Sequence, residues 1–312
     1  MHYSVILNPD ATGGNAQTIW ALIEEQLNTQ NVDYGLMTTK SPSDFAFFAR
    51  RLYQSWRATD TTVIVVGGDG TLHRAINALV QTAQEYGLDP LPVAYIPTSR
   101  VSRFARAYGI SLDPVHALSQ ILAADGITNV ALGHYRDALK GQDSYFLNGL
   151  GIGFDAALIN LSRKKRQRRN FRVGMLRFLF QTIAVIYHQQ SFSLMVRQKR
   201  RRTLFTSAYI ILVANHPYLD SGFVLESDNN IGEEKLELIV AERRGWPITI
   251  WQLIQFYRGK LGESRFATKI TGQRFQLTTT SLEFSQTDGE YYGNRFTDIA
   301  IDVSTYPFRQ AH

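Results

Sequence analysis

A chain of 312 residues that is 44% hydrophobic is long enough to bury one large core or, more often, two domains. The absence of cysteine excludes disulfides, cysteine-ligated zinc and thiol nucleophiles, and it fits a reducing compartment. No apolar run is long enough to span a membrane and the opening residues lack the features of a signal peptide, so we expect a cytoplasmic protein, and its net charge of +6 favours anionic partners.

Up to about residue 130, short apolar strands alternate with amphipathic helical stretches. Strands are predicted at Tyr3 to Leu7, Thr62 to Val66 and Pro92 to Ile96. Helices are predicted around residues 19–27, at 43–54, from residue 71, and around residues 102 and 116. This alternation predicts a parallel sheet covered by helices on both faces.

After about Leu132 the pattern becomes rich in strands. Strand-like segments fall at residues 191–197, 204–214, 236–241, 275–279, 282–284 and 299–303, and helical patterns remain near 175–188 and 248–258. We therefore predict an α/β domain with a parallel sheet over residues 1–132 and a β-sandwich-like domain over residues 133–303. The C-terminal tail, residues 304–312, is a candidate to rejoin the first domain.

The stretch VVGGDGTLHRAINAL places three glycines where the strand ending at Val66 gives way to a helix. Parallel sheets bind ligands at the carboxyl ends of their strands. Glycines there let backbone N–H groups approach an anion, and the helix N-terminus adds its positive dipole end. Asp69 inside the loop fits phosphate binding chiefly if Mg²⁺ lies between them. The alternative is a tight strand-to-helix turn in which Asp69 caps the helix.

Four stretches together resemble a known family. These are the GGDGT loop, NPDATGG at Asn8 to Gly14, FLNGLGIGFDAAL at Phe146 to Leu158, and DGE at Asp288 to Glu290. In order and spacing they resemble the diacylglycerol kinase catalytic-domain family, which includes the bacterial YegS-like and DgkB-like lipid kinases. NAD kinases and phosphofructokinases share a similar GGDGT loop, but the β-rich second half and the absence of a later Asn-Glu pair fit them less well.

The resemblance implies an ATP-dependent kinase that phosphorylates a hydroxyl of a diacylglycerol-like lipid, with a nucleotide-binding first domain and a lipid-substrate second domain. ATP would be held by Asn8, Thr39, Gly67, Gly68, Asp69, Gly70, Thr71 and Arg100. Asp69 and Glu233 would hold Mg²⁺. Glu290, with Asp288, would take the proton from the attacking alcohol, because phosphoryl transfer needs positioning, charge neutralisation and one base. The alternative for DGE is a hairpin turn, since Asp-Gly is a common turn pair.

Several positions depart from the family pattern. An aspartate and a glycine of the family motif are replaced by Arg103 and Ser99, and Arg74 and Ala131 stand where acidic residues are expected. Arg100 and Arg103 could contact phosphate directly. The alternative function is a catalytically impaired relative that binds nucleotide or lipid in a regulatory role.

A basic stretch over residues 163–177 precedes an apolar helical pattern, and no acidic residue occurs from Ala156 to Leu219. Basic and apolar side chains together are typical of an element at an anionic membrane surface. We therefore expect a peripheral protein at the inner membrane face, the alternative being a solvated loop and a core helix. Nucleic acid is not expected, because no nucleic-acid-binding motif accompanies the charge. A homodimer is a further hypothesis.

Overall fold

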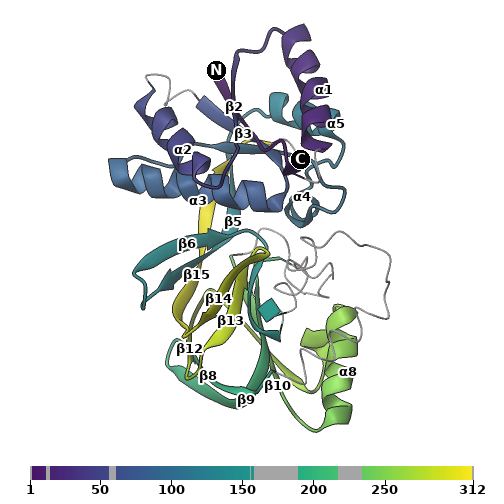
Figure 1. Ribbon diagram of the computed structural model, residues 1–312, viewed down its shortest axis with the longest axis vertical. Helices are drawn as coiled ribbons and strands as arrows, with labels where there is room; N and C mark the ends of the chain where they lie inside the picture. The colour runs from purple at the N-terminus through teal and green to yellow at the C-terminus, as the bar shows by residue number, and fades with distance from the viewer. Residues whose placement is uncertain are drawn as a thin grey trace. The chain divides into compact units, whose positions relative to one another are not determined.

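The structure is a computed structural model, and it describes residues 2–11, 15–55, 61–154, 156–157, 189–216 and 234–310. The chain divides into two units, one formed by Met1–Leu132 with Thr305–His312 and the other by Gly133–Ser304. Helices accompany the strands of the first unit, whereas strands make up most of the second (Figure 1). The predicted fold class, an α/β unit with a parallel sheet followed by a strand-rich unit, is confirmed.

A parallel sheet forms the centre of the first unit. Its strands are β1 (His2–Leu7), β2 (Tyr34–Thr38), β3 (Thr61–Gly67) and β4 (Val93–Pro97), in the order β2-β1-β3-β4. The apolar run of β3 is buried at every position. Continuous burial of this kind is typical of a central strand in a parallel sheet, because both of its faces are covered.

Helices cover both faces of this sheet. α1 (Asn15–Thr29) and α5 (Pro114–Leu122) pack into one core with the sheet, in which Trp20 and Ile121 join Ile64 and Ile96. α2 (Asp44–Gln54) and α3 (Asp69–Tyr86) pack against each other on the other face, where α3 contacts β3 and β4 (Figure 1). The short helix α4 (Arg103–Ala107) follows β4 and is capped by the Ser102 hydroxyl, which accepts a hydrogen bond from the backbone N–H of Ala105.

The end of the chain completes the first unit. β15 (Asp298–Phe308) reaches β4, where Phe308 pairs with Val93 in parallel. The backbone N–H of Arg309 donates to the Val93 carbonyl at 2.8 Å, and the Tyr306 hydroxyl donates to the Leu91 carbonyl at 2.9 Å. The residues after Ser304 therefore extend a sheet whose other strands come from the first third of the chain.

The described residues of the second unit include eleven strands, of which β5 and β15 also contain residues of the first unit. They are β5 (Thr128–Asp137), β6 (Gln142–Phe146), β7 (Gly149–Gly153), β8 (Phe192–Gln198), β9 (Arg201–Ala214), β10 (Leu236–Glu242), β11 (Ala267–Gly272), β12 (Arg274–Thr279), β13 (Glu283–Thr287), β14 (Glu290–Arg295) and β15. Their pairing runs β14-β13-β7-β9-β8-β12-β15, with β10 between β9 and β11, and β5 beside both β15 and β6. α8 (Trp246–Tyr257) and the short 3₁₀ helix η3 (Leu261–Glu263) lie between β10 and β11 in the chain.

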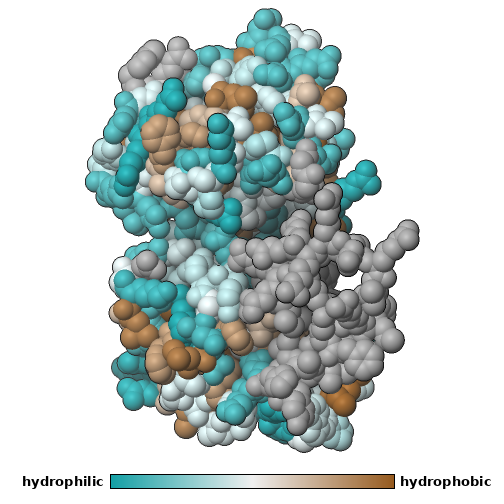
Figure 2. All heavy atoms as spheres, viewed as in Figure 1, coloured by the Kyte–Doolittle hydropathy of each residue, from teal (hydrophilic) through white to brown (hydrophobic). Residues whose placement is uncertain are grey.

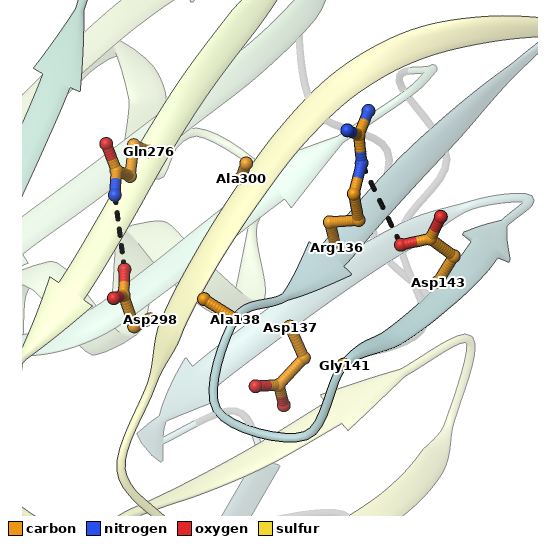
Figure 3. A pocket seen from close by; sticks show the side chains of 8 residues that line it. All are labelled: Arg136, Asp137, Ala138, Gly141, Asp143, Gln276, Asp298 and Ala300. Atoms are coloured by element: carbon orange, nitrogen blue, oxygen red, sulfur yellow. Dashed lines mark hydrogen bonds and ion pairs between the residues drawn. The ribbon is translucent and has the colours of Figure 1, made fainter.

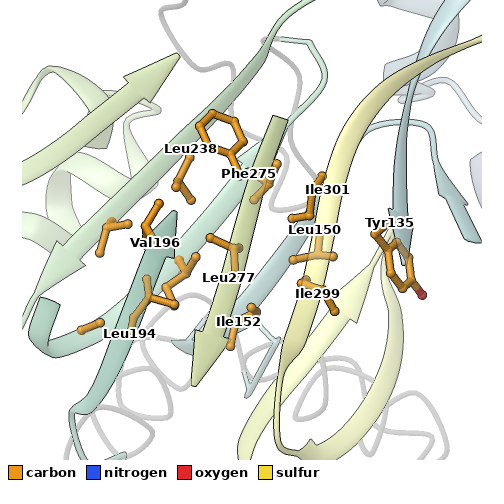
Figure 4. Packing of buried hydrophobic residues seen from close by; sticks show 14 of the residues in the cluster. Tyr135, Leu150, Ile152, Leu194, Val196, Leu238, Phe275, Leu277, Ile299 and Ile301 are labelled. Atoms are coloured by element: carbon orange, nitrogen blue, oxygen red, sulfur yellow. The ribbon is translucent and has the colours of Figure 1, made fainter. Parts of the chain in front are cut away.

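Strand β9 takes part in two cores. Ile211 and Val213 lie in the core formed with β8, β12 and β15, whose side chains Figure 4 shows. Leu212 and Ala214 lie in a second core, where Leu253 and Phe256 of α8 cover the strands. Because successive side chains of a strand point to opposite faces, one apolar run can supply both cores.

Candidate functional site

The carboxyl ends of the four parallel strands bring several predicted site residues to one edge of the sheet. Asn8 follows β1 and donates its backbone N–H to the Val66 carbonyl at 3.1 Å, and Thr39 follows β2 and donates to the Leu7 carbonyl at 2.8 Å. Thr98 follows β4 and donates to the Gly67 carbonyl at 2.9 Å. The segments after β1, β2 and β4 thus lie beside the glycine-rich loop, at the edge where such sheets bind ligands.

The glycine-rich loop leads directly into α3, an 18-residue helix. Gly68 is its N-cap and supplies no side-chain hydrogen bond to the first turn. A Cβ atom on Gly68 or Gly70 would have no atom within 4 Å, whereas one on Gly67 would lie 2.6 Å from the Thr71 side chain. Gly67 is therefore required by strand-to-helix packing, while Gly68 and Gly70 border open space beside the helix N-terminus, which attracts anions.

The side chains of Asn8 and Thr71 meet across this loop. The Asn8 amide donates to the Thr71 hydroxyl at 3.0 Å, although 63 residues separate them in the chain. The contact holds the segment after β1 against the first turn of α3. Of the residues predicted to hold ATP, the structure thus places Asn8, Thr71 and the loop glycines together, with Thr39 buried at the end of the adjacent strand.

Asp69 is turned toward the segment after β4. Its Oδ1 accepts hydrogen bonds from the hydroxyls of Tyr95 and Ser102, and its Oδ2 accepts from the backbone N–H of Arg103 at 2.9 Å. The Arg103 Nε also lies 3.9 Å from Oδ2. Burial and the nearby Asp69 charge raise the pKa of the Tyr95 hydroxyl well above its ordinary value of 10.0, so this hydroxyl stays protonated and donates.

These contacts do not fit a carboxylate that ligates Mg²⁺. A metal ligand offers an oxygen lone pair to the cation, but each Asp69 oxygen already accepts two hydrogen bonds from the protein. Oδ1 accepts from the hydroxyls of Tyr95 and Ser102, and Oδ2 accepts from the backbone N–H groups of Arg103 and Phe104. Within the part of the chain that the structure describes, no group of three or more histidine and acidic residues could hold a metal ion. The second predicted metal ligand, Glu233, lies outside the described residues. The geometry instead gives Asp69 a positioning role, because it fixes the start of α4 beside the glycine-rich loop.

The positions that depart from the family pattern have different surroundings. Arg103 is partly buried next to Asp69, while Arg100 is exposed three residues earlier in the same segment. Ala131 is buried in β5, and its carbonyl accepts a hydrogen bond from the Tyr108 hydroxyl. Arg74 lies in α3 and is partly exposed. Of these substituted positions, Arg103 contacts the predicted site carboxylate Asp69.

In the second unit, the DGE motif forms a hairpin turn between β13 and β14. Thr287 pairs with Glu290, and the two residues between them, Asp288 and Gly289, have φ angles of 48° and 79°. Positive φ at both central residues is the geometry for which Asp-Gly is preferred in tight hairpins. The backbone of the DGE motif is therefore a hairpin turn, as the alternative interpretation of this motif predicts.

The Asp288 carboxylate is bound by the protein itself. It accepts hydrogen bonds from the backbone N–H groups of Leu147, Asn148 and Gly149, at 2.6, 2.8 and 3.1 Å. Asn148 in turn contacts His216, with 2.9 Å between Oδ1 and Nε2. These contacts show Asp288 holding the turn before β7.

Glu290 lies two residues beyond Asp288 and is partly buried. Burial raises the pKa of the nearby Tyr292 hydroxyl, and the charges of Glu290 and Asp288 raise it further. The Tyr292 ring also lies 5.0 Å from the Arg295 guanidinium. Glu290 therefore sits among aromatic and polar side chains of the second unit, and its role as a base stays a prediction.

A pocket of about 370 Å³ opens elsewhere in the second unit, around the turn between β5 and β6 (Figure 3). Its carboxylates are engaged by the protein: Asp298 accepts from Gln276, and Asp137 accepts backbone N–H groups of its own turn. The pocket contains none of the predicted site residues. It does not change the assignment of the candidate site.

The basic segment 163–177 and the predicted helix at 175–188 lie outside the described residues. Among the helices of the described part, none is long and apolar enough to cross a membrane. The expected contact of the basic segment with an anionic surface therefore stays a prediction.

Sequence reasoning missed several residues that shape these sites. Tyr95 and Ser102 bind Asp69, and Asn148 and His216 extend the Asp288 contacts. Ser102 had one signal, its place before a predicted helix. Asn148 lies in the FLNGLGIGFDAAL stretch that carries the family resemblance, although its contact cannot be read from the sequence. Tyr95 and His216 carried no signal, because their partners are distant in the chain.

Fold and loop together define an α/β protein of the class that places a glycine-rich strand-to-helix turn at the edge of a parallel sheet. Residues 2–135 match the family model described as the diacylglycerol kinase catalytic domain. The resemblance to this family that the sequence motifs indicate is confirmed.

Individual proteins show the same similarity over the whole chain. "Putative lipid kinase YtlR" of Bacillus subtilis (strain 168) is 24% identical over 99% of this chain and 98% of its own. A crystal structure titled as "a putative diacylglycerol kinase" from Bacillus anthracis str. Sterne has a TM-score of 0.71 at 20% identity, covering 99% of this chain and 95% of its own. Another, of a diacylglycerol kinase from the same organism, has a TM-score of 0.67 at 18% identity, covering 99% and 96%. At these identities the structural similarity shows the fold.

Proposed function

We propose that this protein is an ATP-dependent lipid kinase that transfers the γ-phosphate of ATP to a hydroxyl of a diacylglycerol-like lipid. The observation that carries the proposal is the glycine-rich turn that opens α3, where the N-cap Gly68 and the first-turn residue Gly70 border open space at the sheet edge. Such a loop suits phosphate groups, because backbone N–H groups and the helix dipole both favour negative charge. The family match over residues 2–135 makes a phosphoryl group the natural anion.

In this proposal the N-terminal unit binds the nucleotide. Asn8, Thr39 and the loop residues Gly67 to Thr71 contact its phosphates, and Arg100 adds a positive charge. Mg²⁺ bound with ATP would neutralise phosphate charge, and the Asp69 contacts favour a metal carried by the nucleotide over one ligated by Asp69. Asp69 then acts indirectly, by holding the loop and α4 in place.

The second unit supplies the base. Glu290 takes the proton of the lipid hydroxyl. At the same time the hydroxyl oxygen bonds to the γ-phosphorus, and the bond between the γ-phosphorus and ADP breaks. Asp288 keeps the hairpin before Glu290 in a fixed geometry, because three backbone N–H groups bind its carboxylate. The lipid would come from the inner face of the membrane, with the basic segment 163–177 contacting anionic headgroups.

Nucleotide binding is tested by thermal unfolding with and without ATP and Mg²⁺. ATP should raise the melting temperature of the wild type, because a ligand that binds the folded state stabilises it. Gly68→Leu should remove the shift without loss of basal stability, because its side chain enters open space at a backbone φ of −90°. Gly67→Ala is the matched control: it should lower basal stability, since its Cβ would meet Thr71. An unchanged wild-type melting temperature at saturating ATP would refute the nucleotide site.

Catalysis is tested with labelled ATP against a panel of lipids. Glu290→Gln should retain the thermal shift and lower turnover by about 10²-fold or more, because it removes the base and keeps the side-chain size. Asp288→Asn is compared in parallel, since its effect on turnover should follow its effect on stability. Wild-type turnover in Glu290→Gln would contradict its assignment as the base.

A catalytically impaired relative that binds nucleotide or lipid in a regulatory role is the second candidate. The observation that favours it is Arg103, whose guanidinium lies beside Asp69 where the family carries an aspartate. This candidate predicts an ATP-dependent thermal shift without phosphorylation of any lipid in the panel.

A further inference from the structure

Helix α8 carries large apolar residues both on its inner side and on its outer side. Leu253 and Phe256 face inward and pack in the core with Leu212 and Ile239. On the opposite side the large apolar residues Trp246, Ile250, Trp251 and Ile254 are 47%, 51%, 47% and 45% exposed. A surface helix of a globular protein normally turns polar residues outward, so this outer face is unusual.

The exposed residues form one continuous stripe. At 3.6 residues per turn, Trp246, Ile250, Trp251 and Ile254 fall within about 140° of the helix circumference. Arg258, also exposed, continues the same side at the end of the helix. Elsewhere in the described residues, exposed apolar side chains are more scattered, as with Leu282 and with the cross-strand pair of Met195 in β8 and Leu204 in β9. Single exposed residues are ordinary, but a contiguous apolar face marks an interaction site.

The surroundings of the stripe are positively charged. Residues 243–260 contain Arg243, Arg244, Arg258 and Lys260 and no acidic residue. The Arg243 guanidinium lies 5.5 Å from the centre of the Trp246 ring, which places a cation beside the apolar face. The nearest acidic residues in the chain are Glu242, which ends β10, and Glu263 in η3. In the view of Figure 2, hydrophobic residues show at the edge where Figure 1 places α8.

We propose that the outer face of α8, with Arg243, Arg244 and Arg258, docks on an anionic lipid bilayer. Tryptophan prefers the boundary between headgroups and acyl chains, isoleucine enters the acyl region, and arginines bind anionic headgroups. The helix lies along the membrane surface, held by its inner face to the second unit. The inference rests on the proposed function only in that a membrane lipid is the substrate. It assigns the docking to α8 and its arginines, which are separate from the basic segment 163–177.

A protein partner would also use tryptophan and arginine. The bilayer fits better because residues 243–260, which carry the apolar stripe, include four basic residues and no acidic residue, and an anionic membrane complements both features. A second copy of the chain would bring like charges together at this face.

The test is sedimentation with vesicles of phosphatidylglycerol and phosphatidylcholine in equal parts, compared with phosphatidylcholine alone. Trp251→Gln combined with Ile254→Gln should weaken binding to anionic vesicles by about tenfold or more, because two side chains no longer enter the membrane. The matched control is Leu204→Gln combined with Leu282→Gln, which removes two residues of similar exposure away from α8 and should bind as the wild type does. Urea unfolding of each variant verifies that the fold is retained.

The arginines are tested separately. Arg243→Gln and Arg244→Gln should each weaken binding to anionic vesicles by about fivefold and leave binding to neutral vesicles unchanged. Vesicles with brominated acyl chains should quench the fluorescence of the wild type, and this quenching should be lost when Trp246 and Trp251 are both replaced by phenylalanine. Unchanged quenching in that variant would overturn the proposal, as would wild-type vesicle binding by Trp251→Gln with Ile254→Gln.

Two further measurements separate this inference from the proposed function and from other occupants. Turnover of a short-chain diacylglycerol below its aggregation limit needs no membrane, so the α8 variants should retain it if the wild type has it. A wild type that lacks turnover but binds vesicles through α8 would refute the kinase and keep the docking surface. A dimer in light scattering that the α8 variants dissociate, without an effect on vesicles, would assign the face to a second copy and overturn the inference.

Discussion

The DGE motif suggested a catalytic role for Asp288, but its carboxylate binds backbone N–H groups and so stabilises the fold. Asp288→Ala removes the acceptor of three backbone N–H groups. It also places alanine, which tolerates positive φ less well than aspartate, at a φ angle of 48°. We expect the free energy of unfolding to fall by about 2–3 kcal/mol, because buried donors lose their partner. Asp288→Asn should cost less, since asparagine tolerates this backbone conformation and keeps an acceptor. Urea denaturation measures both, and equal losses would contradict the hydrogen-bond account.

Arg103 is the clearest departure from the family pattern. Its contact with Asp69 determines how a change back to the aspartate of the family would affect stability. Arg103→Asp would place a second carboxylate near Asp69, where the guanidinium Nε now lies 3.9 Å from Oδ2. We expect a loss of about 3 kcal/mol in unfolding free energy, because a partly buried pair becomes a like-charge contact. Arg103→Gln, which removes the charge alone, should lose less. If Arg103→Asp were more stable than the wild type, the Asp69 carboxylate would not be stabilised by the charge of Arg103.

The residue-level contacts were the least predictable part of the site. The sequence correctly located Asp69 at the junction of a strand and a helix, because that depends on neighbouring residues, although the helix begins at Asp69 itself and not at residue 71. Its partners Tyr95 and Ser102 lie 26 and 33 residues away and reach it through the pairing of β3 with β4. The amides that bind Asp288 lie about 140 residues earlier. Both partners lie in stretches that carry the family resemblance, but the sequence does not show which backbone N–H groups the Asp288 carboxylate binds.

At the scale of elements, most buried strands and amphipathic helices were predicted, whereas the buried strand β5 and several edge strands were not. β3, β9 and β10 have long apolar runs because they are covered on both sides or between two neighbours. Apart from β5, which lies between β15 and β6, the strands without a prediction include β2, β6, β11 and β14, and each of these four lies at an end of the pairing order. β2 is only partly buried along its length. An edge strand needs less apolar surface, so its sequence pattern is weak.

The first turn of α2 provides a pH-dependent test at this scale. The Asp44 carboxylate accepts hydrogen bonds from the backbone N–H groups of Lys40 and Ser41, at 2.6 and 2.8 Å, and these bonds lower its pKa below the ordinary 3.8. A lowered pKa in the folded state adds stability above pH 3.8, which is lost as the pH falls through the folded-state value. Asp44→Asn should therefore be less stable than the wild type at neutral pH, and the difference should shrink below about pH 4. Urea unfolding across this range measures it, and a constant difference would contradict the charge-based explanation.

At the scale of the whole molecule, the chain returns to its first unit after building the second. β15 pairs with β12 through residues 298–302 and then with β4 through Phe308. The N-terminal unit is thus completed by residues far from it in sequence, where Phe308 packs against Phe104. Folding of the first unit should depend on the end of the chain, although its other strands need only the first third.

Phe308→Ala tests this dependence. Phe308 is 2% exposed, so the truncation leaves a cavity beside Phe104 and β4, and we expect a loss of about 3 kcal/mol in unfolding free energy. The loss should appear in the first unit: hydrogen exchange should speed up for the amides of β3 and β4, and less for those of β8 and β9, which pair within the second unit. Thr305→Ala, at an exposed position of the same strand, is the control and should leave both sets unchanged. Equal acceleration in both units would mean that they unfold together and that β15 joins them into one cooperative structure.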